Sequence, residues 1–396
     1  MQEINKLFLD EDLPAGRLVR GLAASGAATA AQLSKATGLG RSTVSTILGD
    51  LREARIVIDV DGRTNGFGRP SQLLSLNPDM GRCAGVLLGL GEIRIVICDM
   101  THTVLSDVQI HLSRDYTPQD AADTVRRSLD AQCRTIGISQ EKLLGVGIAI
   151  SAPLSFDGKV LNSDVLPSWA GVDIAEIFAS RLDCPLHAEN ESHCGALAEM
   201  TWGAAIGEAD FVLCKFDLGV GGAIVRDNAV VRGVNGSAAE FGHIVLDPQG
   251  PHCRCGNRGC LKGHVAGDYL IRLAQDIIGE PVTIDQFVER AAEGQMVYRR
   301  LIEDAAEKAG WGMGIIGTIL NPPLFVIAGK LAAIGKNFLE PLERSLRRYM
   351  LPQPENVSGL PIPRFVVARF LGNDDTVMGA VALVLRQHGK IASRPM

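Results

Sequence analysis

The segment from Gly242 to Cys260 constrains the fold of this chain most strongly, because four potential metal ligands occur within it. These ligands are His243, Cys253, Cys255 and Cys260. One imidazole and three thiolates suit tetrahedral zinc, and a fully protein-ligated ion is structural because no coordination position stays open for substrate. Glycines at 256 and 259 permit the tight turns that bring the sulfurs together. The sequence therefore predicts a structural zinc site.

Two alternative interpretations of this segment are a disulfide and a different histidine ligand. Disulfides are disfavoured because Cys253 and Cys255 are too close in sequence to pair easily, and the N-terminus shows no signal for an oxidising compartment. His252 is a spare ligand candidate, but a direct neighbour of Cys253 would be strained in reaching the same ion.

Bulk properties predict a cytoplasmic protein without a membrane partner. The 396 residues are enough for two or three domains, and 46% of them are apolar. No apolar run reaches the roughly 18 uncharged residues that a bilayer span needs, and the first residues lack a secretory pattern. Six cysteines outside the metal segment (83, 98, 133, 184, 194 and 214) are interpreted as buried thiols of a reducing compartment.

Charge is distributed unevenly along the chain. The formal net charge is −6, yet residues 16–72 contain eight basic residues against four acidic ones. A basic head on an acidic body favours a polyanionic partner for the head.

The apolar pattern of this head predicts three short helices, around residues 18–23, 29–36 and 41–51. In the third helix, the spacing i, i+3, i+4 and i+7 predicts one buried stripe, made by Val44, Ile47, Leu48 and Leu51. The opposite face carries the small residues Ser42, Ser45, Thr46 and Gly49, and the helix opens with Arg41; the predicted DNA contacts are Arg41, Ser42, Thr43, Ser45 and Thr46. Such a face fits a DNA major groove; the alternative is a solvated helix in a three-helix bundle.

Two strands, at 56–60 and 73–76, are expected after the third helix. The glycine-rich connection between them contains Arg63 and Arg69, which are expected to contact phosphates or a narrow minor groove. Residues 1–80 are therefore predicted to form a winged helix-turn-helix DNA-binding domain.

Two motifs resemble the ROK family of repressors, open reading frames and sugar kinases. Glu240-Phe241-Gly242-His243 followed by Cys-x-Cys-Gly-x-x-Gly-Cys is similar to the family signature. Gly-Arg-Pro and Leu-x-Leu-Asn-Pro, within residues 68–78, resemble the segment that closes the winged helix of ROK repressors.

The body, residues 81–396, alternates strand and helix patterns, which indicates an α/β fold. Strands are expected at 86–100, 144–151, 185–188 and 211–216, with helices at 118–136, 172–182 and 194–202. The resemblance implies the two-lobed actin-like, ribonuclease-H-like fold of sugar kinases, with lobes at about 81–195 and 196–396 and a C-terminal helix able to return to the first lobe.

Kinases of this family hold ATP and magnesium at an Asp-x-Gly-Gly-Thr turn. This chain has Leu87, Leu90 and Gly91 in place of the aspartate, the second glycine and the threonine. Leucine cannot bind magnesium, and a bulky side chain crowds a phosphate. A later glycine run, residues 218–223, is retained, but glycines also serve simply to let strands bend. The prediction is a protein that is not an enzyme.

The sugar side of the family site is better preserved. The catalytic Asn-Asp pair reads Asn190-Glu191 here, and Glu240 and His243 match the family's sugar contacts. The extra methylene of glutamate displaces a catalytic base but keeps a hydrogen-bond acceptor, so these four residues are predicted to bind a sugar-like effector. Lys262 stands where the family has a second glutamate. The alternative is that these polar residues only brace the zinc loop.

Together these features predict a DNA-binding transcriptional regulator, a repressor of carbohydrate-related genes. Its expected partners are a double-stranded operator, a sugar-like effector, and further copies of itself in a homodimer or homotetramer, because one winged head contacts only a half-site. Two alternatives stay open: a ROK sugar kinase with an added DNA-binding head, and a regulator without an inducer that a protein partner controls.

Overall fold

The computed structural model describes residues 13–25, 27–60, 73–161, 165–351, 363–372 and 374–387. The protein divides into two compact units, each made of residues that contact one another more than they contact the other unit. Unit 1 comprises residues 1–152, 157–197 and 377–396, and unit 2 comprises residues 153–156 and 198–376. Within the described ranges, no helix is both long enough and apolar enough to cross a membrane.

The N-terminal head, within unit 1, contains three helices and a small sheet. The helices are α2 (Pro14–Ser25), α3 (Ala30–Thr37) and α4 (Arg41–Glu53), and the strands are β1 (Ala27–Ala28), β2 (Val57–Val60) and β3 (Leu73–Leu76). The sheet order is β1-β3-β2, with both pairs antiparallel. Thr29 begins α3 with a capping box, which satisfies two backbone N–H groups at that end. The three predicted helices and two predicted strands are confirmed.

The rest of unit 1 is built on one five-stranded sheet of order β6-β5-β4-β7-β8. The strands are β4 (Arg82–Gly89), β5 (Glu92–Asp99), β6 (Val104–His111), β7 (Leu143–Ile150) and β8 (Leu186–Asn190). Strands β4, β5 and β6 pair antiparallel, whereas β7 and β8 run parallel to β4. The apolar run that the sequence suggested as one strand at 86–100 is a hairpin, because the chain turns at Leu90-Gly91.

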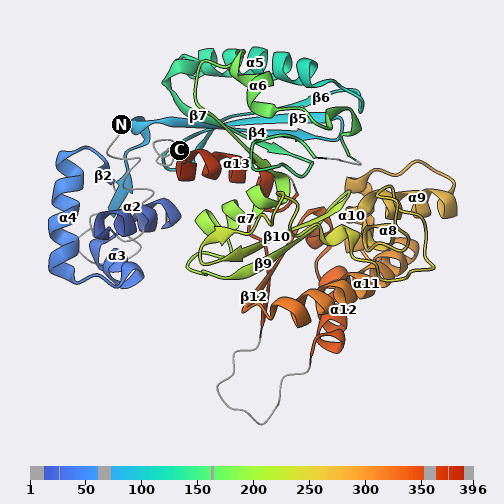
Figure 1. The fold of residues 1–396 in the computed structure, drawn as a ribbon. Helices are drawn as coiled ribbons and strands as arrows, with labels where there is room; N and C mark the ends of the chain where they lie inside the picture. Colours follow the sequence, from blue (N-terminus) through green and yellow to red (C-terminus); the bar gives the residue numbers. More distant parts are fainter. Residues whose placement is uncertain are drawn as a thin grey trace, which may run out of the picture. The chain divides into compact units, whose positions relative to one another are not determined.

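Helices cover both faces of this sheet (Figure 1). Helices α5 (Pro118–Thr135) and α6 (Ile174–Ala179) lie on one face, and α13 (Asp374–Gln387) lies on the other. On the second face Ala380 of α13 packs with Ala149 of β7 and with Cys194 of α7 (Glu191–Trp202). The last described helix of the chain therefore returns to unit 1.

Unit 2 contains a second five-stranded sheet, of order β11-β10-β9-β12-β13. Its strands are β9 (Phe211–Phe216), β10 (Val220–Arg226), β11 (Ala229–Val230), β12 (Leu324–Ala328) and β13 (Arg364–Val367). Its helices are α8 (Lys262–Val265), α9 (Gly267–Ile278), α10 (Ile284–Ala292), α11 (Met296–Leu320) and α12 (Lys336–Tyr349). Short 3-10 turns include η4 (Phe241–His243) and η5 (Lys330–Ile334).

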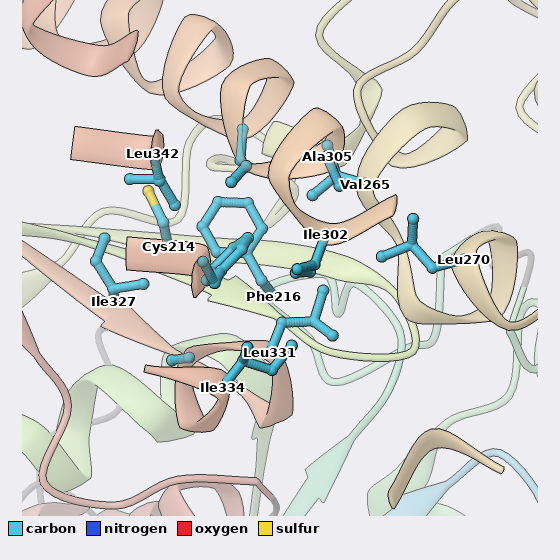
Figure 2. Close-up of a cluster of buried hydrophobic side chains, with 14 of the residues drawn as sticks. Cys214, Phe216, Val265, Leu270, Ile302, Ala305, Ile327, Leu331, Ile334 and Leu342 are labelled. Atoms are coloured by element: carbon cyan, nitrogen blue, oxygen red, sulfur yellow. The ribbon is translucent and has the colours of Figure 1, made fainter. Parts of the chain in front are cut away.

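The core of unit 2 lies between its sheet and helices α11 and α12 (Figure 2). Phe216 of β9 meets Phe338 of α12 edge to face, with ring centroids 5.5 Å apart. Ile327, Ile302 and Leu342 are completely buried around this pair. Each such side chain contributes about 1.5–3 kcal/mol by leaving water.

Candidate functional site

The four predicted metal ligands converge in unit 2. One donor atom each from His243, Cys253, Cys255 and Cys260 can be chosen so that all four lie within 4.8 Å of one another. The Cys255 and Cys260 sulfurs are 3.7 Å apart, as are the Cys253 sulfur and His243 Nδ1. Zinc–sulfur bonds of about 2.3 Å in a tetrahedron place neighbouring sulfurs about 3.8 Å apart. The donor types and their spacing therefore fit one tetrahedral metal ion.

Local backbone pairing brings these ligands together. Leu246 N donates to Gly259 O at 2.9 Å, and Leu261 N donates to Ile244 O at 2.8 Å, so Cys260 lies beside the end of η4. Gly259 has φ +61, and a Cβ there would lie 1.6 Å from the Asp247 carbonyl oxygen. Only glycine fits this position, which explains the glycine immediately before the last cysteine.

The thiols of the metal site differ in their surroundings. Cys260 is buried, whereas Cys255 is exposed. Burial raises the pKa of the Cys260 thiol to about 12, and the neighbouring Cys255 and Cys253 thiols add to the effect. A bound cation would reverse this preference, because metal ligation requires the thiolate.

The alternatives to a metal site do not match the structure. None of the nine cysteines forms a disulfide. His252 is not part of the ligand group, and its Nε2 accepts a hydrogen bond from Arg258 Nη2 at 2.6 Å.

Glu240 directly precedes η4, the turn that ends in His243. The residue before it, Ala239, has φ +65, which is unusual for a side chain with a Cβ and costs about 1 kcal/mol or more. This strained residue sets the direction in which the chain enters η4. The predicted effector residue and a predicted metal ligand are thus held on one short turn.

The other two predicted effector residues lie in unit 1, where β8 leads into α7. Glu191 is half-buried at the first position of α7 and accepts a hydrogen bond from the Ser151 hydroxyl. Asn190 is buried; its Oδ1 accepts from Ser192 N at 2.8 Å, and its Nδ2 donates to Ala152 O at 3.1 Å. Asn190 therefore caps α7 and fixes the position of Glu191.

A buried pair of side chains, His193 and Glu189, lies at the same junction of β8 and α7. His193 Nδ1 lies 3.0 Å from Glu189 Oε1, and both side chains are at least 94% buried. The same carboxylate oxygen accepts from Asn190 N at 2.9 Å. Sequence reasoning missed Ser151, Glu189 and His193. A histidine three residues after Asn190 was the one visible signal.

The nucleotide-side turns lack a magnesium carboxylate at the predicted position. Leu87 is a buried residue of β4. At the retained glycine run, Asp217 Oδ1 accepts from Leu218 N at 2.8 Å, and its Oδ2 accepts from Lys330 N at 2.9 Å. Both oxygens of the Asp217 carboxylate therefore accept hydrogen bonds from backbone N–H groups, one at the start of the glycine run and one at Lys330.

A buried charged cluster in unit 2 was also missed. Lys215, in the middle of the sheet, donates to Asp375 Oδ1 at 2.9 Å and to Thr376 Oγ1 at 2.5 Å. All three residues are at least 97% buried, and Asp375 Oδ2 makes no hydrogen bond. Burial raises the pKa of Asp375 to about 6 despite the nearby Lys215. A lysine within the apolar run 211–216 was the available signal.

Helix α4 carries five of the residues that the sequence predicts to contact DNA. Val44, Leu48 and Leu51 are buried and Ile47 is half-buried, so the predicted stripe faces the head's core. The five predicted contact residues, Arg41, Ser42, Thr43, Ser45 and Thr46, are exposed, as are Gly49, Asp50 and Glu53 of the same helix. The N-terminus of α4, after Gly40, is not capped by a side chain. Arg63 and Arg69 lie outside the described residues.

The two α/β sheets, with a Cys/His metal loop beside the second, define a sugar-kinase-like body preceded by a small helical head. A family model for the ROK family matches residues 83–387, and the chain belongs to this family. The predicted family and the actin-like fold class are confirmed.

Similar proteins include both repressors and kinases. The xylose repressor of Caldicellulosiruptor bescii is 26% identical over 405 residues, covering 97% of this chain and 96% of the repressor. A glucokinase of Halalkalibacterium halodurans is 27% identical over 268 residues, covering 64% of this chain and 79% of the kinase. A crystal structure of a ROK family transcriptional regulator, homologous to the E. coli MLC protein, superposes with a TM-score of 0.70 at 21% identity, covering 95% of this chain and 97% of the regulator.

Proposed function

We propose that this protein is a DNA-binding transcriptional repressor of carbohydrate-related genes that acts in the cytoplasm and contains one structural zinc ion. The observation that carries the proposal is the exposed face of α4. Small polar side chains and Arg41 project from a helix whose opposite face is buried. Such a face can approach base edges closely. The xylose repressor match, which extends over 97% of the chain, supports this proposal.

Residues of the head are assigned to two kinds of contact. Ser42, Thr43, Ser45 and Thr46 read base edges, and Arg41 with the uncapped start of α4 contacts backbone phosphate. Arg63 and Arg69 are assigned to phosphates or the minor groove. The operator is an inverted repeat bound by a homodimer or homotetramer, because each head reads one half-site.

DNA binding is tested by selecting sequences from a genomic library with the full chain. Arg41→Ala should weaken binding to all sequences and reduce the slope of affinity against salt by about one. Ser45→Ala should instead reduce the preference for one base over the others, at a single operator position, by about 1–3 kcal/mol. Arg127→Ala, the same charge loss on α5, is the matched control. Equal affinity of Arg41→Ala and the control at every salt concentration would refute the assignment.

We further propose that a sugar-like effector releases the protein from DNA without being phosphorylated. Glu191, positioned by Asn190 and Ser151, and Glu240, beside the ligand His243, supply the acceptors for sugar hydroxyls. The buried Leu87 and the engaged carboxylate of Asp217 support the loss of ATP chemistry. Lys262 favours a sugar that carries an acidic group.

The effector is tested with a panel of neutral and acidic sugars in competition with operator DNA. Glu191→Ala should leave DNA affinity unchanged and abolish release, because an effector acts only through its difference in affinity between two states. Glu176→Ala removes an exposed acid on α6 and is the control. ATP-dependent formation of a sugar phosphate that disappears in Glu191→Ala would contradict this proposal and favour the alternative, a sugar kinase with an added DNA-binding head.

A further inference from the structure

One side chain of the body reaches the N-terminal head. His102 lies in the turn between β5 and β6, and its Nε2 donates a hydrogen bond to the Ala23 carbonyl oxygen in the last turn of α2. The two residues are 79 positions apart, and both belong to unit 1. Because a carbonyl oxygen only accepts hydrogen bonds, the contact requires the imidazole hydrogen on Nε2.

The backbone of His102 has an unusual conformation. Its φ is +55, which glycine adopts freely and which is disfavoured for a residue with a Cβ. The turn around it is tightly bonded: Asp99 Oδ1 accepts from Thr101 N at 2.7 Å and from Thr103 N at 3.1 Å. In addition, His102 N donates to Asp99 O at 3.0 Å. A glycine would relieve the strain but would carry no side chain to the head, so the strain points to a role for the imidazole.

The contact satisfies a carbonyl group that helix α2 cannot satisfy by itself. The last four carbonyl oxygens of an α-helix have no partner within the helix, and Ala23 is one of the last four residues of α2. The Ser25 hydroxyl lies 3.5 Å from the Leu22 oxygen, whereas the Ala23 oxygen receives its hydrogen bond from the body. Ala23 is only 2% exposed, so loss of this hydrogen bond would be costly.

The covalent link between head and body lies at the same end of the sheet as His102. Strand β3 of the head ends at Leu76 and β4 of the body begins at Arg82, with the short 3-10 turn η1 (Pro78–Met80) between them. Arg82 is paired with Asp99 in the β4–β5 ladder, and Asp99 begins the turn that contains His102. The head is therefore attached to the body at two neighbouring points, one covalent and one hydrogen-bonded.

We propose that His102 is a latch that fixes the orientation of the DNA-binding head on the body. A short covalent link leaves rotation about its single bonds, and a second attachment point removes that freedom. The consequence for DNA rests on the proposed function: a pair of chains whose heads are held in one orientation recognises half-sites at one spacing. Without the latch, the heads should accept several spacings.

The test compares two amide variants of the full-length protein that differ in reach. The amide nitrogen of His102→Gln lies nearly as far from the backbone as imidazole Nε2, whereas that of His102→Asn lies one bond closer. Asparagine, however, tolerates a positive φ better than glutamine does. A latch therefore predicts wild-type behaviour for His102→Gln and loss of function for His102→Asn, and backbone strain alone predicts the opposite order.

Amide hydrogen exchange detects the latch without DNA. The amides of α2 should exchange about 5-fold faster in His102→Asn than in the wild type, the change expected for one lost hydrogen bond, and His102→Gln should match the wild type. Asn228→Gly is the control, because Asn228 has φ +60 at the turn between β10 and β11 in unit 2. Relief of a positive φ at that turn should leave exchange in α2 unchanged.

Operator selection measures the consequence of the latch. His102→Asn should keep wild-type affinity for a single half-site. Its preference for one spacing of an inverted repeat over a longer one should fall about 10-fold or more, because two heads each lose one contact.

Equal exchange of α2 in the wild type and His102→Asn would overturn the latch, and so would faster exchange in His102→Gln than in His102→Asn. Faster exchange in His102→Asn with an unchanged spacing preference would make His102 a helix cap and overturn the fixed orientation. Failure of the wild type to bind any DNA would refute the proposed function, while hydrogen exchange would still decide whether the latch exists.

Discussion

Unit 2 holds two polar clusters that are built in opposite ways. The metal loop gathers four ligands from residues 243–260, and one of them, Cys255, is exposed. The Lys215–Asp375 cluster joins residues 160 positions apart, and both side chains are at least 97% buried. Ligation can order a loop that has little core of its own, whereas the buried pair depends on the core that surrounds it. Removing one member should therefore have different consequences at the two places.

Loss of the metal should change both the zinc content and the thermal stability of the protein. Cys255→Ser removes an exposed thiolate, so the change in packing is small, yet zinc content should fall from one ion per chain to near zero. Because ligation energy is coupled to ordering of the loop, the Tm should fall by several degrees, about 2–4 °C for each kcal/mol lost. Elemental analysis and calorimetry measure the two effects.

Cys184→Ser is the control for the zinc experiment, because Cys184 lies outside the ligand group. Glu240 directly precedes the turn that ends in the predicted ligand His243. Sugar-induced release from DNA should therefore be lost together with zinc. Absence of zinc from wild-type protein purified without chelator would contradict the metal site.

The buried pair should respond to single and double substitution in opposite ways. Lys215→Met leaves the Asp375 carboxylate buried without its cation and should destabilise the fold by about 3–5 kcal/mol. Lys215→Met combined with Asp375→Leu removes both charges and should be close to neutral. Denaturant unfolding of both variants measures the difference, and zinc content should stay at one ion per chain in each. Equal destabilisation by the single and double variants would show that the pair contributes only its packing.

The change in unfolding free energy that Asp375 causes between pH 4 and pH 6 should be somewhat smaller than the effect of Lys215→Met. Burial raises the pKa of Asp375 from 3.8 to about 6. Between these values the folded protein holds a proton that the unfolded chain has released, so this group stabilises the fold below pH 4 and loses that contribution as pH rises to 6. The loss is roughly 3 kcal/mol.

Comparison with the double variant isolates this contribution, because the variant lacks the Asp375 carboxyl while other titrating groups are shared. The difference in unfolding free energy between wild type and variant should fall as pH rises from 4 to 6. A difference that is constant over this range would contradict the raised pKa.

Much of the candidate site was predictable because its signals are local. The ligands His243, Cys253, Cys255 and Cys260 are close in sequence, so the donor types and the neighbouring glycines alone indicate a metal loop. Three helices of the head followed from apolar spacing over a few turns. The single strand expected at 86–100 was wrong for a related reason: two apolar strands joined by a short turn read as one run.

Tertiary structure alone decided how distant residues meet. Nothing in sequence spacing joins Lys215 to Asp375, because strand β9 and helix α13 are brought together only by the folded core. The same holds for Trp311 and Tyr349, which stack only because α11 and α12 pack closely. Local patterns specify turns, helices and ligand sets, since these depend on neighbours along the chain. Burial, shared hydrogen bonds and exposed surfaces depend on neighbours in space, so they appear only when the chain has folded.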